Sequence, residues 1–126
     1  MKRRQAREKA LQYLFQLNFT DSIKNVSEEM YNQNVYFDSV TKGVIENQLE
    51  IDETIKNHLQ NWKFERIGSI EKTVLRIAVY EILFMKDIPN GVAINEAVEL
   101  AKTFGEDHSG TFVNGILSNI IKSEGN

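Results

Sequence analysis

The chain has 126 residues, which suffices for one folded domain with a single core but hardly for two. It contains no cysteine, so disulfides, thiolate metal sites and cysteine nucleophiles are excluded. No apolar run approaches the roughly 18 residues of a membrane span, and the N-terminus lacks the apolar core of a signal peptide, so we expect a cytoplasmic protein with no membrane association.

The charge is distributed unevenly along the chain. The net charge is −3, yet the first nine residues carry five basic groups and one acidic group. A concentrated basic patch allows a protein that is acidic overall to bind a polyanion. The N-terminal segment is therefore the first candidate for a nucleic-acid contact.

The first predicted element is a helix over residues 2–19. Arg3, Arg4 and Arg7 continue its apolar stripe towards the N-terminus, and burying three unpaired guanidinium groups in a core is not credible. We therefore predict that this helix overhangs the body and directs its arginines outward. The alternative is a solvated, fraying N-terminus. The docking face behind the arginines is formed by apolar residues at helical spacing, namely Ala10, Leu11, Leu14, Phe15 and Leu17.

The middle of the chain predicts further helices. An N-cap at Ser27 indicates a short helix to about Asn34. Apolar residues at helical spacing then cover residues 36–48 and, after a break near residues 50–52, continue to Leu59. Trp62 and Phe64 follow in a connector, where we expect them to close the end of the bundle.

The C-terminal half predicts the centre of the fold. Residues 70–85 are apolar almost all round, as in a central buried helix. A break around Pro89 precedes a helix over residues 92–104, with Gly105 directly after its end. A last helix runs to about Lys122, with Ser109 as a possible N-cap. The pattern as a whole predicts an all-α fold.

No catalytic arrangement is recognisable. His58 and His108 lie in unrelated segments, so each is expected at the surface rather than on a metal. The glycines match no phosphate-binding loop, and the acidic pair Glu106 and Asp107 suits an exposed helix end. We predict a protein without catalytic residues, metal or cofactor.

The residues around the last loop point instead to RNA recognition. Phe104 ends one predicted helix and Phe112 begins the next, with Lys102 nearby. RNA-binding proteins combine cationic groups for phosphates with aromatic faces for unstacked bases. Ser109 and Gly110 would add backbone N–H groups at a helix start. From spacing alone, the favoured alternative is that both phenylalanines belong to the core and Ser109 is merely a cap.

Four sequence runs resemble the NusB family of transcription antitermination factors. They are residues 70–81 (IEKTVLRIAVYE), residues 87–89 (DIP) followed by 92–102 (VAINEAVELAK), residues 112–117 (FVNGIL) and the arginine-rich opening at 3–12 (RRQAREKALQ). These runs span both ends of the chain in the family's order, and the total length also fits.

The resemblance implies a compact all-α bundle of about seven helices in two packed subdomains, a single NusB-like RNA-binding domain over residues 1–126. It implies binding of boxA-type single-stranded RNA together with NusE, a small-subunit ribosomal protein. In that family the pair acts with other Nus factors on transcribing RNA polymerase, promoting read-through of terminators and ribosomal RNA transcription. No catalysis and no cofactor are implied, and a homodimer remains open.

The resemblance also assigns residues by position. The NusE-facing surface would include Phe15, with Phe19 one turn on, and Glu71. His108 stands where relatives carry acidic residues, and Thr111 where a lysine can occur, so affinity and specificity for RNA need not match the family's. The implied RNA surface comprises Arg3, Arg4, Arg7, Lys102, Phe104, Ser109 and Phe112.

Some features of the resembling runs are interpreted as structural. Arg76, Tyr80 and Glu81 lie in the central predicted helix, and we expect Arg76 to pair internally. Asn95 and Asn114 are expected to bond to backbone groups at helix junctions.

Two other classes of function stand as alternatives. A similar helical domain precedes the catalytic domain of some ribosomal RNA cytosine methyltransferases, so the chain could be such an isolated RNA-binding accessory domain. A purely structural dimerisation module is the second alternative, and it would leave the arginine stripe dispensable for any effect on RNA.

Overall fold

The computed structural model describes residues 2–17 and 34–124. Their elements are α1 (Arg3–Leu17), α3 (Val35–Glu46), α4 (Gln48–Lys56), a 3-10 turn (Phe64–Arg66), α5 (Ser69–Phe84), α6 (Asn90–Phe104) and α7 (Ser109–Glu124). These residues contain no strand, which confirms the all-α prediction, and they form six α-helices where about seven were expected. None of the helices so described is long and apolar enough to cross a membrane. The short helix predicted after Ser27, and Phe19, lie outside the described residues.

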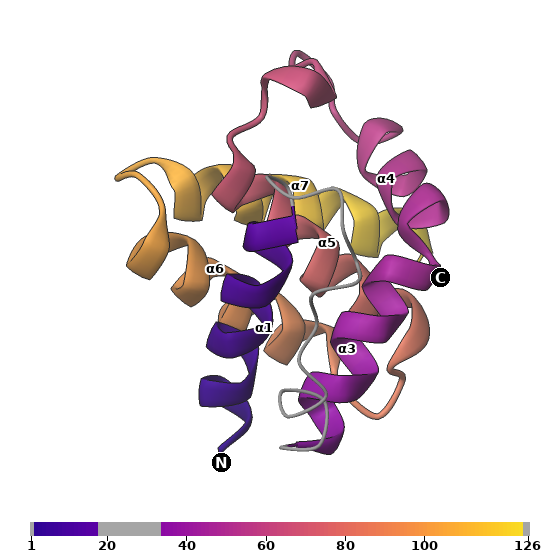
Figure 1. Ribbon diagram of the computed structural model, residues 1–126. Coiled ribbons are helices and arrows are strands. Elements are labelled where there is room, and N and C mark those ends of the chain that lie inside the picture. The colour runs from indigo at the N-terminus through magenta and orange to yellow at the C-terminus, as the bar shows by residue number, and fades with distance from the viewer. Residues whose placement is uncertain (1, 18–33, 125–126) are drawn as a thin grey trace.

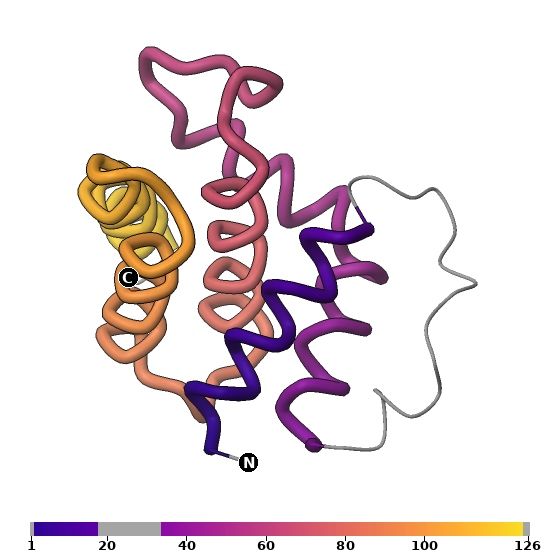
Figure 2. The backbone as a smooth tube through the Cα atoms, turned by 60° about the vertical axis from the view of Figure 1, so that its left-hand side comes forward, coloured from indigo at the N-terminus to yellow at the C-terminus, as the bar shows by residue number. Residues whose placement is uncertain are grey.

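Helix α5 is the centre of the bundle, as its all-round apolar pattern predicts. Helices α1, α3 and α4 pack against it on one side, and α6 and α7 on the other (Figures 1 and 2). Side chains around its whole circumference are buried, including Val74, Leu75, Ile77 and Val79. This arrangement brings the N-terminal helix α1 beside the C-terminal half of α5.

The junction between α3 and α4 lies at Asn47, a few residues before the predicted break. Both the backbone N–H and the side-chain amide of Asn47 donate to the Gly43 carbonyl, at 2.9 and 2.8 Å. At the other end of α3, the Asn34 side chain accepts from the Phe37 N–H at 3.1 Å and caps the helix. Local hydrogen bonds to asparagine thus define both ends of α3.

Two residues of α5 contact neighbouring helices, which agrees with the structural role expected for them. Arg76 forms a bidentate ion pair with Asp52 of α4, with Nε–Oδ1 and Nη2–Oδ2 distances of 2.8 and 3.0 Å, which confirms the predicted internal pairing. The Tyr80 ring lies so close to Gly43 of α3 that a Cβ there would collide with it. Glycine at position 43 therefore permits the close approach of α3 and α5.

The connector between α4 and α5 is anchored through Phe64 rather than Trp62. The half-buried Phe64 ring packs against the core and lies under the cations of Lys72, Lys56 and Arg76, at 4.5, 5.2 and 5.7 Å from its centroid. Trp62 is 60% exposed, so the prediction that it closes the bundle is wrong.

Candidate nucleic-acid interface

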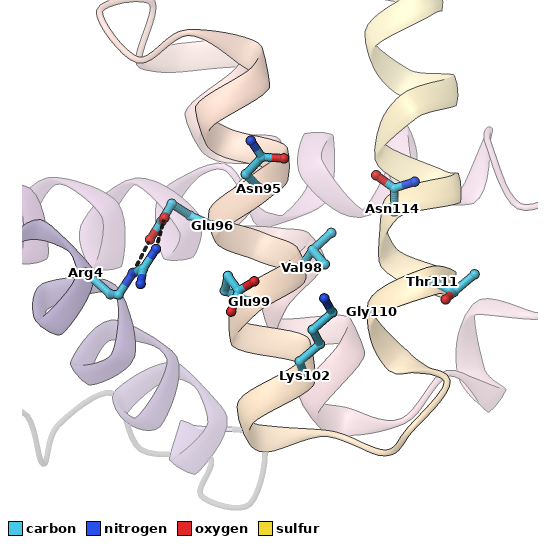
Figure 3. A pocket seen from close by; sticks show the side chains of 9 residues that line it. All are labelled: Arg4, Asn95, Glu96, Val98, Glu99, Lys102, Gly110, Thr111 and Asn114. Carbon is cyan, nitrogen blue, oxygen red and sulfur yellow. Dashed lines mark hydrogen bonds and ion pairs between the residues drawn. The ribbon is translucent and has the colours of Figure 1, made fainter.

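A groove joins the N-terminal helix to the last two helices. It has a volume of about 780 Å³ and lies between the start of α1, the exposed side of α6 and the first turns of α7 (Figure 3). Its lining comprises Arg4, Asn95, Glu96, Val98, Glu99, Lys102, Gly110, Thr111 and Asn114. Residues from both ends of the chain, including the predicted Arg4 and Lys102, therefore meet in one depression.

The guanidinium of Arg4 is bound by a carboxylate at the edge of this groove. Its Nε and Nη2 donate to Glu96 Oε1 and Oε2 at 3.0 and 2.7 Å (Figure 3). The hydrogen bond and the positive charge of Arg4 lower the pKa of Glu96, so the carboxylate stays ionised. The Arg4 side chain remains 61% exposed. Arg4 is thus accessible to an anion, but a phosphate has to compete with Glu96.

Lys102 supplies the second cation of the groove. Its side chain is exposed and extends along α6 towards Gly110 of α7, where an added Cβ would lie only 3.1 Å from Lys102 Cγ. No ion-pair partner for Lys102 occurs among residues 2–17 and 34–124. Its ammonium group is therefore available to a ligand without displacing an acidic side chain.

Arg7 does not project outward, and this prediction is wrong. Its side chain is only 4% exposed, and its guanidinium forms a bidentate ion pair with Glu81 of α5 at 3.0 and 2.9 Å. The Tyr36 hydroxyl donates to the same carboxylate at 2.6 Å. A buried arginine needs a partner, and Glu81 provides it for Arg7. In this fold Arg7 presents no surface to RNA.

Arg3 lies exposed at the start of α1, as predicted. Its guanidinium carbon sits 5.4 Å from the centroid of the Tyr36 ring, and Arg7 lies 5.1 Å from the same centroid. Tyr36 itself is buried, and burial together with the nearby Glu81 charge raises the pKa of its hydroxyl. The stacking orients Arg3 without neutralising its charge.

The two phenylalanines beside the last loop are neither fully in the core nor fully exposed to a ligand. Phe104 and Phe112 are both half-buried and pack against the core, so part of each ring stays accessible. Phe112 also meets the Trp62 ring edge to face, with centroids 5.6 Å apart. Phe112 thus has an aromatic partner, Trp62, that no sequence pattern indicated.

Ser109 is not available to RNA, and its assignment to the RNA surface is corrected. The side chain is fully buried, and its Oγ accepts from the Glu106 N–H at 2.8 Å. Its own N–H donates to the Glu106 carbonyl at 3.0 Å. Ser109 therefore closes the turn before α7 instead of capping that helix or offering a free N–H.

Two asparagines that were expected to bond to backbone groups at helix junctions line the groove instead. Asn95 and Asn114 are exposed in the interiors of α6 and α7, and both border the depression in Figure 3. Their expected position at helix junctions is wrong. Asn95, Glu99 and Lys102 recur at helical spacing, and this polar stripe is the signal that could have predicted the groove wall.

Comparisons with known proteins bear on this interface. A model of the NusB family matches residues 4–122. The transcription antitermination protein NusB of Bacillus velezensis is 49% identical over 124 residues, covering 95% of each chain. NusB of Bacillus cereus is 45% identical over 126 residues, covering 95% of this chain and 97% of the relative. The chain belongs to the NusB family.

Solved structures of NusB proteins have the same fold. NusB from T. maritima superposes with a TM-score of 0.85 at 38% identity, covering 97% of this chain and 92% of that one. A crystal structure of the antitermination factors NusB and NusE in complex with double-stranded RNA gives a TM-score of 0.82 at 30% identity, covering 96% of both chains. The relatives are named as transcription antitermination proteins and not as enzymes.

The residues that the NusB resemblance assigns to the NusE-facing surface are only partly accessible. Phe15 is half-buried near the end of α1, and Glu71 in the first turn of α5 is 9% exposed. The Glu71 carboxylate lies against Gly68, where a Cβ would come within 2.7 Å of Oε1. Phe19 lies outside the described residues.

Of the two positions that depart from the pattern of the NusB resemblance, one lines the groove. His108 is exposed in the loop before α7, and Thr111 is exposed in its first turn and lines the groove. In the part of the chain that the structure describes, no group of three or more histidine or acidic side chains could hold a metal ion.

Proposed function

We propose that this chain is a transcription antitermination factor that binds boxA-type single-stranded RNA together with ribosomal protein NusE. Acting with other Nus factors on transcribing RNA polymerase, it would promote read-through and ribosomal RNA transcription. The observation that carries the proposal is the 45–49% identity to NusB proteins along nearly the whole chain. A fold shared with a NusB–NusE–RNA complex supports it.

The RNA surface we propose excludes Arg7 of α1, which the sequence suggested. It adds residues of α6 and α7. Arg3, Arg4 and Lys102 provide accessible cations for phosphates. Asn95 and Asn114 add amide groups that can hydrogen-bond to bases or ribose. Because Arg4 is paired with Glu96, the groove offers little net positive charge. We therefore expect weak RNA binding by the chain alone and tighter binding once NusE adds its own contacts.

We propose that Phe15 and Glu71 contact NusE, with Phe19 as a further candidate. A half-buried aromatic ring and a partly accessible carboxylate suit a protein interface, where a few such anchors provide most of the affinity. An alternative use of the same faces is a homodimer, which would compete with NusE.

The proposed architecture is a single domain of two packed groups of helices. The group of α1, α3 and α4 and the group of α6 and α7 share α5, and this division supports the two-subdomain description (Figure 2). The methyltransferase accessory domain is less favoured, because the chain covers 95% or more of the length of antitermination proteins.

Fluorescence anisotropy with a labelled boxA-type RNA, with and without NusE and over a salt series, tests the proposal. We expect NusE to tighten RNA binding. The double substitution Arg4→Ala/Lys102→Ala should weaken binding and lower the salt slope by about 1.4, because each lost phosphate contact to single-stranded RNA contributes about 0.7. Lys9→Ala removes an exposed cation of the same helix outside the groove and should leave both quantities unchanged.

Two outcomes would contradict the proposal. The first is an affinity and salt slope in the double variant equal to those of the unmodified chain. The second is effective competition by an unlabelled duplex of the same sequence, because we propose a single-stranded ligand although a relative has been solved with double-stranded RNA.

A further inference from the structure

A second concavity lies beyond the groove, beneath the connector between α4 and α5. It has a volume of about 310 Å³, and its apolar walls are formed by Trp62, Ile67 and Phe112. The Trp62 and Phe112 rings meet at 80°, so together they form a corner with two aromatic surfaces. Arg66, His108 and Glu71 complete the lining.

The exposure of Trp62 is not explained by the fold. An indole ring contributes most to stability when it is buried, yet Trp62 is 60% exposed. The segment around it is nevertheless anchored on its C-terminal side by Phe64 under three cations and by the buried Ile67. Trp62 thus exposes a large aromatic surface to solvent from an anchored segment of the chain, which is typical of a binding surface.

The chemistry of this concavity fits an unstacked nucleobase. A planar base can stack on one ring while its edge meets the other, and such stacking accepts any base. The exposed guanidinium of Arg66 at the rim can hold the adjoining phosphate.

The concavity adjoins the proposed phosphate groove. Thr111 lines both depressions, and Phe112, which carries one aromatic wall, is the next residue of α7. A strand whose phosphates lie along Arg4 and Lys102 can therefore extend past Thr111 and place a base against Trp62. The shared residue Thr111 therefore favours a single strand that occupies both depressions.

We propose that Trp62 and Phe112 form a base-stacking site for one unstacked nucleotide of a single-stranded RNA. This inference rests on the proposed RNA-binding function and adds to it a residue, Trp62, outside the positions that the family resemblance assigns. The site extends the RNA path from the start of α1, across α6 and α7, to the connector before α5.

The lone tryptophan of the chain makes the site directly observable. Binding of a short boxA-type RNA should quench Trp62 fluorescence, with the same midpoint as the anisotropy of a labelled RNA measured in parallel. Incorporation of 5-fluorotryptophan places a single fluorine at position 62, so ¹⁹F NMR can follow it in the complex with unlabelled NusE as well. A shifted resonance on RNA addition is expected in both cases.

Substitutions and a modified RNA test the stacking itself. Trp62→Ala should weaken RNA binding about 5- to 150-fold, the range found for removal of one base–aromatic stack, whereas Trp62→Phe should restore most of the affinity. Replacing successive nucleotides by abasic ones should identify one position that weakens binding to the unmodified chain but not to Trp62→Ala. Lys63→Ala, at the adjacent exposed position, is the matched control and should bind normally.

The outcomes separate this inference from the function on which it rests. RNA binding by anisotropy with an unchanged Trp62 signal and unchanged affinity of Trp62→Ala would overturn the stacking site and leave the function intact. Loss of NusE binding in Trp62→Ala, with RNA affinity retained, would assign the concavity to the protein partner and also overturn the inference. Absence of RNA binding by the unmodified chain, with and without NusE, would instead overturn the proposed function.

Discussion

Arg7 and Glu81 form a bidentate ion pair inside the core, joining α1 to α5 across 74 residues of sequence at distances of 3.0 and 2.9 Å. Tyr36 of α3 donates to the same carboxylate, so three helices meet at one buried charge. Glu96 of α6 lies 3.6 Å from the Arg7 guanidinium and also binds Arg4. The orientation of the N-terminal end of α1 is therefore coupled to the core.

Arg7→Ala should destabilise the protein strongly. Removing one partner of a buried ion pair leaves an uncompensated charge, here on Glu81, and typically costs about 3–5 kcal/mol. Urea unfolding followed by circular dichroism measures the loss, and Arg3→Ala on the exposed side of the same helix serves as the control. An unfolding midpoint of Arg7→Ala equal to that of the unmodified chain would show that the pair contributes nothing.

Tyr36→Phe should lower stability by about 1.5–3 kcal/mol, the range for hydrogen bonds to charged groups. Because the pKa of Tyr36 is raised in the folded state, the phenol stays protonated there while the unfolded chain ionises near pH 10. The stability from this group is therefore complete below about pH 10 and is lost as the pH rises further. Urea midpoints of the two proteins should differ by a constant amount up to that pH and converge above it; a constant difference up to pH 11 would contradict the assignment.

The fold was largely predictable, whereas the polar links between its helices were not. Helical periodicity predicted α1, α5, α6 and α7 to within a few residues, because a buried stripe repeats locally in the sequence. The partner of Arg7 is 74 residues away, and no local pattern reveals it. The same holds for Glu96 beside Arg4, 92 residues apart. Pairing of charges depends on tertiary packing. Arginines on the same face of α1 can therefore be buried, like Arg7, or exposed, like Arg3 and Arg4.

Gly43→Ala and Gly115→Ala should change stability in opposite directions. Alanine stabilises an exposed helical position by about 1 kcal/mol relative to glycine, and nothing lies within 4 Å of a Cβ at Gly115. At Gly43 the same Cβ would collide with the Tyr80 ring, and forced repacking should cost about 1–3 kcal/mol. Thermal unfolding of the two variants compares them directly. A stabilised Gly43→Ala protein would show that Tyr80 can move away freely.

The candidate site was predictable only in outline. Arg3, Arg4 and Lys102 are exposed as their charge suggests, because long cationic side chains seldom lose water without a partner. The polar stripe on α6 that includes Asn95 was visible in the sequence, but its role depends on α7 lying alongside to form a groove. Trp62 was expected to close the end of the bundle, and the short connector that exposes it has no periodicity from which its exposure could be predicted.

Glu96→Gln should strengthen RNA binding by releasing Arg4. Glutamine keeps the shape of the side chain but removes the charge that competes with a phosphate, so we expect the affinity to rise about two- to tenfold. The lowered pKa of Glu96 keeps the carboxylate charged at mildly acidic pH, so acidification to about pH 5 should not reproduce the effect.

A double-mutant cycle distinguishes release of Arg4 from a general loss of negative charge. In an Arg4→Ala background, Glu96→Gln should have little effect on RNA affinity, because the guanidinium that it frees is absent. Glu99→Gln removes a charge from the same groove without breaking the bidentate contact and should change the affinity less than Glu96→Gln. Equal gains from both glutamine variants, or a full effect of Glu96→Gln without Arg4, would show that Glu96 acts only through the overall charge of the groove.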